Sequence, residues 1–139
     1  MPQYFFIQSL LSGNLVLDIK GANPAQGTPI IAWPRKSSGT DNQLWTITND
    51  GFIQSKLNDF VLDIRGANPA QGTDIIAWPR KSSGTQNQQW ILSSVGFIQS
   101  QLNNLVLDIK GGTPTPGTQI ITWPRKSSGT QNQQWILTW

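Results

Sequence analysis

The chain has 139 residues, 12% of them charged, and a formal net charge of +3, and this length suits one compact domain rather than two. All seven acidic residues are Asp, and His, Cys and Glu are absent, so the usual acid–base, nucleophile and zinc-ligand sets are missing. We therefore expect no enzymatic activity, no cofactor and no metal site. Strong helix formers are scarce while Gly, Pro, Ser, Thr, Asn and Ile abound, which favours short strands joined by turns.

The N-terminal segment 1–6 has neither the basic segment nor the apolar stretch of a signal peptide. No apolar run is long enough to span a bilayer, so we expect no membrane insertion. The absence of Cys excludes a disulfide framework and fits a reducing compartment. Together these features predict a protein that is cytoplasmic or is released without a conventional signal peptide.

One unit of 45 residues occurs three times, at about residues 1–49, 50–94 and 95–139, within one expected domain spanning 1–139. Polar residues recur as faithfully as apolar ones, although a packed core usually tolerates exchange among similar apolar residues. The repetition therefore indicates a repeated site alongside a repeated scaffold.

In the second copy, the short apolar period predicts strands at 52–55, 60–64, 74–78 and 88–92, with turn signals between them. Four such strands cannot bury an apolar face alone, so the three units must share a core. Closing all twelve strands into one object also removes exposed sheet edges. The sequence predicts an all-β fold, a β-trefoil with pseudo-three-fold symmetry. The alternative is an open array of small sheets or a small propeller, for which three blades would be too few.

Two tryptophans recur in each unit. One alternates with polar neighbours on a strand, which predicts burial in the core for Trp45, Trp90 and Trp135. The other precedes a proline that ends its strand, at Trp33, Trp78 and Trp123. This second tryptophan is either a half-exposed platform or a lid over the end of the core.

An Asp stands at or near the end of an apolar strand in each unit, at Asp18, Asp63 and Asp108. Burying a carboxylate is costly unless donors satisfy it, so this Asp either accepts backbone N–H groups from the Gly-rich turn that follows or serves a ligand. The recurring amides Asn42, Asn87 and Asn132 either cap the next strand or serve the same ligand. A carboxylate, an amide and an aromatic plate together suit a neutral sugar, which offers directed hydroxyls and an apolar C–H face.

Nine of the ten basic residues also occupy repeated positions, among them the pairs Arg35-Lys36, Arg80-Lys81 and Arg125-Lys126. The charge is thus divided among three equivalent spots, whereas a nucleic-acid footprint is normally contiguous, so we expect no nucleic-acid partner. The pairs lie either in solvated loops or beside a ligand. In the second case Lys36, Lys81 and Lys126 are candidates for secondary sugar contacts.

The motif Asn42-Gln43-Leu44-Trp45, which returns at 87–90 and 132–135, resembles the Q-x-W signature of ricin B-like (R-type) lectins. With Leu17-Asp18-Ile19 and Trp33-Pro34, the resemblance extends over nearly the whole chain. It implies a β-trefoil that binds galactose or N-acetylgalactosamine. The Asp would accept hydrogen bonds from the 3- and 4-hydroxyls, the first Trp would stack on the sugar, the Asn would complete the hydrogen bonds, and the Gln would support the site from behind. These roles fall on Asp18, Trp33, Asn42 and Gln43, on Asp63, Trp78, Asn87 and Gln88, and on Asp108, Trp123, Asn132 and Gln133.

The sequence departs from the family at Ile31, Ile76 and Ile121, where relatives often carry a Gln that bonds the sugar. Because all three sites are otherwise intact, we predict a non-enzymatic, trivalent lectin that binds and cross-links glycans on glycoproteins or glycolipids. One alternative is a carbohydrate-binding module of a larger toxin or glycosidase with a different sugar preference. Another is a trefoil that binds no sugar, such as an inhibitor or signalling protein.

Overall fold

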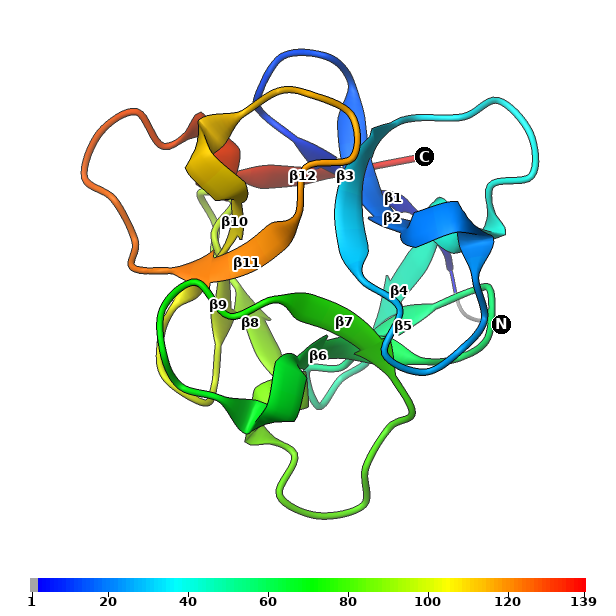
Figure 1. The fold of residues 1–139 in the computed structure, drawn as a ribbon, viewed down its shortest axis with the longest axis vertical. Helices are drawn as coiled ribbons and strands as arrows, with labels where there is room; N and C mark the ends of the chain where they lie inside the picture. The colour runs from blue at the N-terminus through cyan, green and yellow to red at the C-terminus, as the bar shows by residue number, and fades with distance from the viewer. Residues whose placement is uncertain (1–2) are drawn as a thin grey trace.

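The computed structural model describes residues 3–139, so the first two residues of the expected domain 1–139 and of the N-terminal segment 1–6 lie outside the described residues. Within this range, twelve strands and six short 3-10 helices form three lobes around a pseudo-three-fold axis (Figure 1). The strands are β1 (Phe6–Ser9), β2 (Leu15–Ile19), β3 (Ile30–Pro34), β4 (Trp45–Ile47), β5 (Ile53–Ser55), β6 (Val61–Ile64), β7 (Ile75–Trp78), β8 (Trp90–Leu92), β9 (Ile98–Ser100), β10 (Val106–Ile109), β11 (Ile120–Trp123) and β12 (Trp135–Thr138). The 3-10 helices are η1 (Lys20–Ala22), η2 (Asp41–Gln43), η3 (Arg65–Ala67), η4 (Gln86–Gln88), η5 (Lys110–Gly112) and η6 (Gln131–Gln133). This architecture confirms the predicted β-trefoil.

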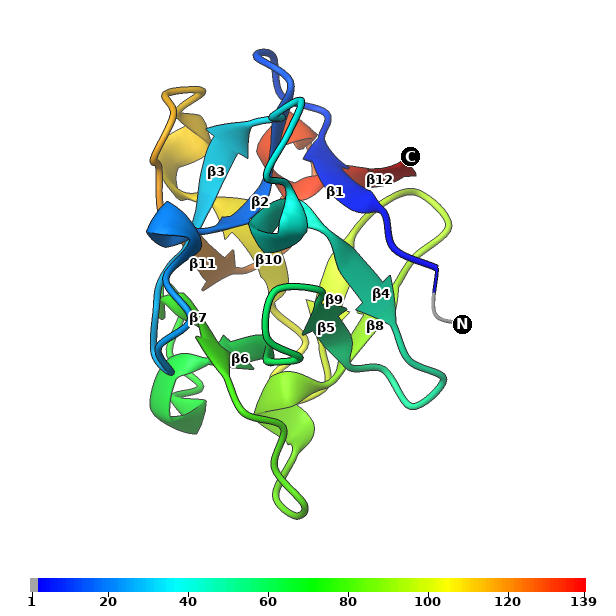
Figure 2. The ribbon, with the colours of Figure 1, turned by 90° about the vertical axis from the view of Figure 1, so that its right-hand side faces the viewer.

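The three antiparallel sheets are offset by one strand from the sequence repeats. Their strand orders are β12-β1-β2-β3, β4-β5-β6-β7 and β8-β9-β10-β11. The last strand of each repeat therefore pairs with the first strand of the next repeat, and β12 pairs with β1 from Phe6↔Thr138 to Ser9↔Trp135. This last pairing closes the ring, because it places β1 beside β12, the last strand of the chain (Figure 2).

The third strands of the repeats, β3, β7 and β11, surround the pseudo-three-fold axis (Figure 1). Isolated bridges join them, namely Pro29↔Ile76, Ile31↔Gln119 and Asp74↔Ile121. The side-chain amide of Gln119 donates to the carbonyl oxygens of Ile30, Ile75 and Ile120 at 3.0, 3.3 and 2.9 Å. One residue of the third repeat thus shares its amide N–H groups among buried carbonyls from all three repeats.

The core tryptophans behave as predicted. Trp45, Trp90 and Trp135 are buried, and their indole N–H groups donate to the carbonyls of Leu17, Leu62 and Leu107 at 3.1, 3.2 and 3.4 Å. Each indole therefore ties the fourth strand of its repeat to the second strand of the same repeat. Buried Leu and Ile side chains from all three repeats fill the space between them.

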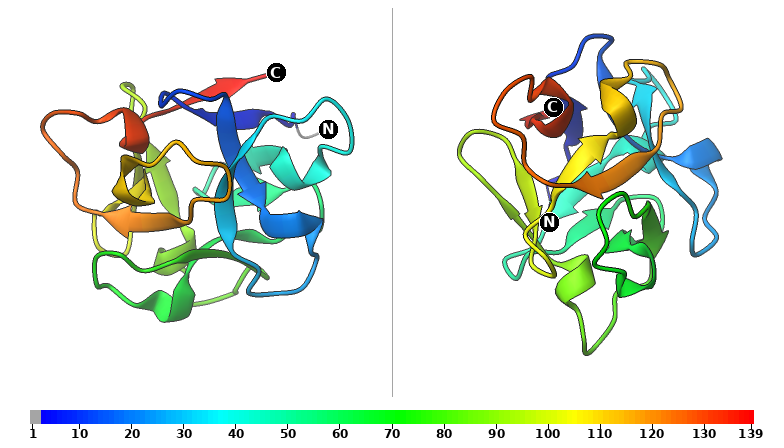
Figure 3. Two further views of the ribbon diagram at one scale, coloured as in Figure 1. Left: turned by 45° about the horizontal axis from the view of Figure 1, so that its top comes forward. Right: turned by 60° about the vertical axis from the view of Figure 1, so that its left-hand side comes forward.

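Strand boundaries differ slightly from those predicted. The strand expected at 88–92 begins only at Trp90, because residues 86–88 form η4, in which the Gln88 backbone N–H donates to the Thr85 carbonyl at 2.8 Å. The strands expected at 52–55, 60–64 and 74–78 each begin one residue later. The loops that follow β3, β7 and β11 project outward from the body (Figure 3). Within residues 3–139 there is no helix with the length and apolar character that a bilayer crossing requires.

Candidate functional site

Three equivalent clusters form where the second strand of each repeat ends. The Asp lies on β2, β6 or β10, and the Trp lies at or next to the end of β3, β7 or β11. The Lys lies in the loop that follows, and the Asn and Gln belong to η2, η4 or η6. We call these clusters site 1 (Asp18, Trp33, Lys36, Asn42, Gln43), site 2 (Asp63, Trp78, Lys81, Asn87, Gln88) and site 3 (Asp108, Trp123, Lys126, Asn132, Gln133). The structure thus brings together the residues that the sequence predicted, in every repeat.

In each site the Gln holds the Asp in place. Its Nε2 donates to Oδ2 of the Asp at 2.9, 2.8 and 2.9 Å in sites 1, 2 and 3, and also to the carbonyl of the proline after the Trp, at 3.0 Å in each site. Its Oε1 accepts the backbone N–H of the Lys at 2.9 or 3.0 Å. Gln43, Gln88 and Gln133 are 0% exposed. They lie behind the Asp and the loop, in the supporting position that the family resemblance implies for them.

The carboxylates are not explained by the turn that follows them. Within residues 3–139, Asp18, Asp63 and Asp108 accept no backbone N–H, and the bond from the Gln engages only Oδ2. Each Asp is only 3% exposed. The strand of Asp18 ends one residue later, because Gly21 and Ala22 turn the backbone with φ values of 65° and 52°. The Asp is therefore held at a buried strand end by a side chain, and not by the turn.

Burial raises the pKa of Asp18, Asp63 and Asp108 above its usual range. The Gln hydrogen bond, the charge of the Lys and the Asn amide act against this rise. A raised pKa means that the surroundings disfavour the ionised form relative to water. A bound molecule that donates hydroxyl hydrogen bonds would supply the stabilisation that the ionised carboxylate lacks.

The Asn and the Lys form a fixed pair beside the Asp. The Asn Nδ2 donates to the carbonyl of the Ile that ends the Asp strand, at 3.0–3.1 Å, and its Oδ1 accepts the Lys Nζ at 2.6–2.7 Å. The Asn therefore links its 3-10 helix to the end of the earlier Asp strand, and this bond differs from the predicted cap on the strand that follows the Asn. It also brings the ammonium of Lys36, Lys81 or Lys126 into the site, next to the carboxylate.

The tryptophans of the sites are half-exposed plates and not lids. Trp33 and Trp123 are 41% and 36% exposed, and Trp78 is half-buried. An edge of each ring lies against a glycine of another repeat, since a Cβ built on Gly117, Gly27 or Gly72 would lie 3.7–3.8 Å from Cζ3 of Trp33, Trp78 or Trp123. Sequence reasoning missed this contact, although the Gly-Thr pair recurs in every copy.

Pockets lie over these side chains. The pocket at site 3 has a volume of about 490 Å³, and the pocket at site 2 about 360 Å³. In both, the Asp, Trp, Lys and Asn share the lining with residues of the turn after the Asp strand, and Gly72 of the second repeat contributes to site 3. No group of three or more His, Cys, Asp or Glu side chains placed to hold a metal ion occurs in the part of the chain that the structure describes.

The arginines of the three basic pairs point away from these sites. The guanidinium carbons of Arg35, Arg80 and Arg125 lie 4.0, 3.9 and 3.9 Å from the ring centroids of Phe6, Phe52 and Phe97. From the sequence, the Arg and the Lys of each pair had the same two predicted positions, a solvated loop or the neighbourhood of a ligand. The structure separates them, with the Lys in the site and the Arg stacked on a buried Phe.

The sequence profile of the ricin-type beta-trefoil lectin domain matches residues 3–135. The chain belongs to the ricin-type β-trefoil lectin family. This lectin aligns with the C-half of an earthworm R-type lectin, solved in complex with GalNAc, at a TM-score of 0.82 and 36% identity, covering 99% of this chain and 98% of that one. ThreeFoil, a designed 3-fold symmetric protein, aligns at a TM-score of 0.85 and 26% identity over 97% of both chains.

A sequence relative points to the same family. The lectin is 44% identical over 41 residues to beta-galactoside-specific lectin 2 of Viscum album, a stretch that is 30% of this chain but only 7% of that protein. The matched domain type is typically a carbohydrate-binding, non-enzymatic one, and it accounts for nearly the whole chain.

Proposed function

We propose that this lectin binds galactose and N-acetylgalactosamine at sites 1, 2 and 3 without chemically altering them, and that it cross-links glycans on glycoproteins or glycolipids. The observation that carries the proposal is the threefold recurrence of one arrangement, with Gln–Asp distances of 2.8–2.9 Å and Lys–Asn distances of 2.6–2.7 Å in every repeat. The GalNAc complex of the earthworm lectin and the name of the Viscum album lectin support this sugar class.

The Asp is the main acceptor in this proposal. Its Oδ2 already accepts from the Gln, which fixes the carboxylate plane and leaves acceptor capacity for two neighbouring hydroxyls of a sugar. Hydrogen bonds to a charged group contribute roughly 1.5–3 kcal/mol each. By the family resemblance, these hydroxyls are the 3- and 4-hydroxyls.

The Lys and the Asn supply donors on the other side of the sugar. One N–H of the Lys ammonium and one N–H of the Asn amide are used within the protein, so each group keeps at least one N–H for a sugar oxygen. The Lys and Asn N–H groups lie beside the Asp carboxylate. Such a combination favours a sugar hydroxyl that donates one hydrogen bond and accepts another. This arrangement supports a direct part in sugar binding for Lys36, Lys81 and Lys126.

The Trp covers the apolar face of the sugar. An axial 4-hydroxyl, as in galactose, leaves a continuous face of C–H groups that a half-exposed indole can cover. Ile31, Ile76 and Ile121, which are 4–5% exposed, stand where relatives often carry a Gln. Their side chains cannot replace the hydrogen bond of that Gln, so the Lys becomes more important here.

Calorimetry tests the sugar class and the number of sites. We expect methyl β-galactoside to bind with a Kd on the order of 0.1–1 mM, about −4 to −5.5 kcal/mol, at three equivalent sites, and methyl β-glucoside to bind far more weakly. The glucoside is the matched control, because only the orientation of its 4-hydroxyl differs. Equal binding of the two sugars would refute the galactose preference, and a stoichiometry near one would show that two repeats are scaffold only.

Agglutination tests cross-linking. Simultaneous use of two or three sites raises apparent affinity by about 10²–10⁴, so galactose-coated beads should agglutinate and free galactose should reverse the effect. A variant with the Asp and Trp of sites 1 and 2 replaced by Ala should keep monosaccharide binding at site 3 but lose agglutination. Agglutination by this monovalent variant at the parent level would refute cross-linking through the sites.

A further inference from the structure

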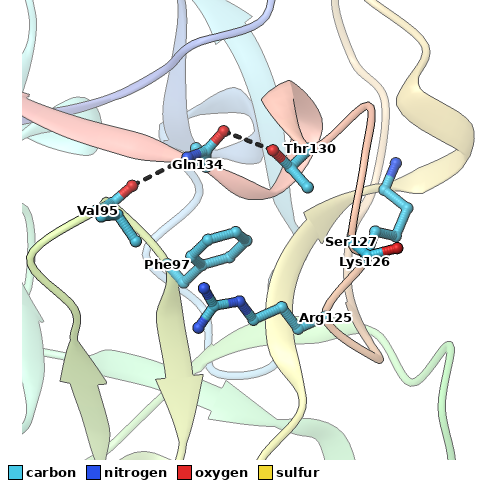
Figure 4. Close-up of a pocket in the computed structure, with 7 residues that line it drawn as sticks. All are labelled: Val95, Phe97, Arg125, Lys126, Ser127, Thr130 and Gln134. Atoms are coloured by element: carbon cyan, nitrogen blue, oxygen red, sulfur yellow. Dashed lines mark hydrogen bonds between the residues drawn. The ribbon is translucent and has the colours of Figure 1, made fainter.

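A further pocket lies beside the loop that carries the third basic pair (Figure 4). It has a volume of about 550 Å³. We call it the Arg125 pocket, and its lining residues are Val95, Phe97, Arg125, Lys126, Ser127, Thr130 and Gln134. Lys126 also lines the pocket of site 3, so the two pockets are neighbours.

The walls of the Arg125 pocket are held by the protein itself. The guanidinium carbon of Arg125 lies 3.9 Å from the ring centroid of Phe97, which is only 3% exposed. Gln134 donates to the Val95 carbonyl at 3.0 Å and accepts from the Thr130 hydroxyl at 2.8 Å (Figure 4). The cation is therefore presented on a fixed aromatic support.

The three equivalent arginines differ in the partners of their guanidinium groups. Arg80 forms an ion pair with Asp50 at 2.7 Å. Arg35 donates to the Trp139 carbonyl at 2.8 Å and to the Thr138 hydroxyl at 3.3 Å. Arg125 makes no hydrogen bond or ion pair through its guanidinium with any residue in the range 3–139.

One sequence difference accounts for the free guanidinium. In the second repeat, Asp50 stands two residues before Phe52. The corresponding residue of the third repeat, two residues before Phe97, is Val95. Val95 is 55% exposed and carries no acceptor in its side chain. The third repeat thus keeps the stacked Arg but lacks the carboxylate that occupies it in the second repeat.

We propose that the Arg125 pocket binds the carboxylate or sulfate group of an acidic saccharide. A guanidinium presents a planar fork of N–H donors that matches a carboxylate or sulfate, and such charge-assisted bonds are stronger than neutral ones. The Ser127 hydroxyl adds a donor, and Phe97 and Val95 offer apolar surface to a sugar ring. That the ligand is a saccharide rests on the proposed lectin function, whereas the binding of an anionic group rests on Arg125 itself.

The test uses glucuronic acid with glucose as its matched neutral control, since neither has the axial 4-hydroxyl that sites 1–3 are proposed to select. Binding is followed by NMR through the Nε–H signal of Arg125 and the backbone signal of Phe97. We expect glucuronate, but not glucose, to shift these signals at a stoichiometry of one, with weaker binding at higher salt. Inorganic sulfate should compete.

Two exchanges between the repeats sharpen the test. Val95→Asp supplies the internal partner of Arg125 and should weaken glucuronate binding at least about tenfold, as should Arg125→Gln. Asp50→Val frees Arg80 and should add a second glucuronate site. Galactoside binding at sites 1–3 should stay unchanged in all three variants, because none of the three substituted residues lines these sites.

Each other outcome is decisive. Failure of glucuronate to shift Arg125, or equal binding by the parent, Val95→Asp and Arg125→Gln, would overturn the proposal. Glucose binding as well as glucuronate would also overturn it. If the parent protein does not bind galactoside, the proposed lectin function is refuted. The glucuronate result then decides the anion site by itself.

Discussion

At sites 1, 2 and 3 the repeats present the same five residue types at nearly the same distances, whereas two positions beside the pseudo-three-fold axis differ between the repeats. The position that holds Gln119 in the third repeat holds Pro29 in the first and Asp74 in the second. Likewise Thr122 stands where the other repeats have Ala32 and Ala77.

The difference follows from geometry. The three sites are separate in space, so identical side chains can be used three times without interfering with one another. The axis is a single place shared by three copies, and three copies of one side chain cannot all occupy it. Gln119 reaches the carbonyls of Ile30, Ile75 and Ile120, and neither Pro29 nor the Asp74 side chain donates to them. Symmetry is therefore kept where function is proposed and broken where the repeats meet.

Removing the carboxylates of sites 1, 2 and 3 should have the largest effect, because it should abolish binding while leaving the packing around the axis intact. The triple variant Asp18→Ala, Asp63→Ala, Asp108→Ala should lose galactoside binding entirely, because each site loses charge-assisted bonds of roughly 1.5–3 kcal/mol each. Its fold should remain intact, since each Gln Nε2 still donates to a proline carbonyl at 3.0 Å. Calorimetry and circular dichroism measure the two effects. A triple variant that unfolds would make these carboxylates structural, and one that still binds would remove them from the sites.

Acidification should affect binding and stability in opposite directions at the same carboxylates. Burial raises the folded-state pKa of Asp18, Asp63 and Asp108 above 3.8, so protonation begins at a higher pH than for an ordinary Asp, and galactoside affinity should fall there. Between the unfolded and folded pKa values the folded state binds more protons, so protonating these groups adds stability as the pH falls.

The triple Asp→Asn variant isolates this contribution. Asn keeps an acceptor for the Gln amide but has no charge, so the variant should be more stable than the parent at neutral pH. The gap should narrow as the pH falls through the raised pKa values. Denaturant unfolding across this range measures the gap. A gap that widens on acidification would show that the folded protein favours the ionised carboxylates.

Much of the fold was predictable because the repeat length and the short apolar period constrain it. Each of the three units carries four strands and buries one Trp. Few closed folds can accommodate twelve strands in this way, and the structure has one of them, the β-trefoil. The strand partners were not predictable, because the pairing of β4 with β5 and of β12 with β1 depends on how the units close. The local pattern around Gln88 resembled a strand, but a backbone bond to Thr85 closes a 3-10 turn there.

The candidate sites were predictable as a set of residues, and the position of the Gln behind the Asp followed only from the family resemblance. The recurrence of Asp18, Trp33 and Asn42 indicated a common site, yet periodicity does not show that Gln43 lies entirely behind Asp18. The contact between Gly117 and Trp33 joins residues of different repeats, and no local pattern encodes it. The different directions of Arg35 and Lys36 depend on the partners that tertiary structure supplies, Phe6 and Asn42.

Breaking the axis should reduce stability without affecting the sites. Gln119→Ala removes the two amide N–H groups that the carbonyls of Ile30, Ile75 and Ile120 share. At about 0.5–1.5 kcal/mol for each lost hydrogen bond, we expect a loss of about 1–3 kcal/mol in the free energy of unfolding. Asp74→Ala is the matched control, because the Asp74 side chain makes no hydrogen bond within residues 3–139, and it should be nearly neutral. Galactoside binding should be unchanged in both variants. Equal losses of unfolding free energy in the two variants would show that the hydrogen bonds of Gln119 do not stabilise the axis.

The smallest expected effect concerns Thr122, whose buried hydroxyl has no hydrogen-bond partner among residues 3–139. Thr122→Val keeps the shape of the side chain and removes the unsatisfied hydroxyl, so the free energy of unfolding should rise by about 1 kcal/mol. Thr122→Ala restores the residue of the other two repeats but removes packed atoms as well, so it should be less stable than the Val variant. The neighbouring Trp123 points to the opposite, exposed face of β11, so site 3 should bind galactoside as before. Thermal unfolding of the three proteins distinguishes the outcomes, and a Val variant less stable than the parent would mean that the Thr122 hydroxyl bonds a buried water.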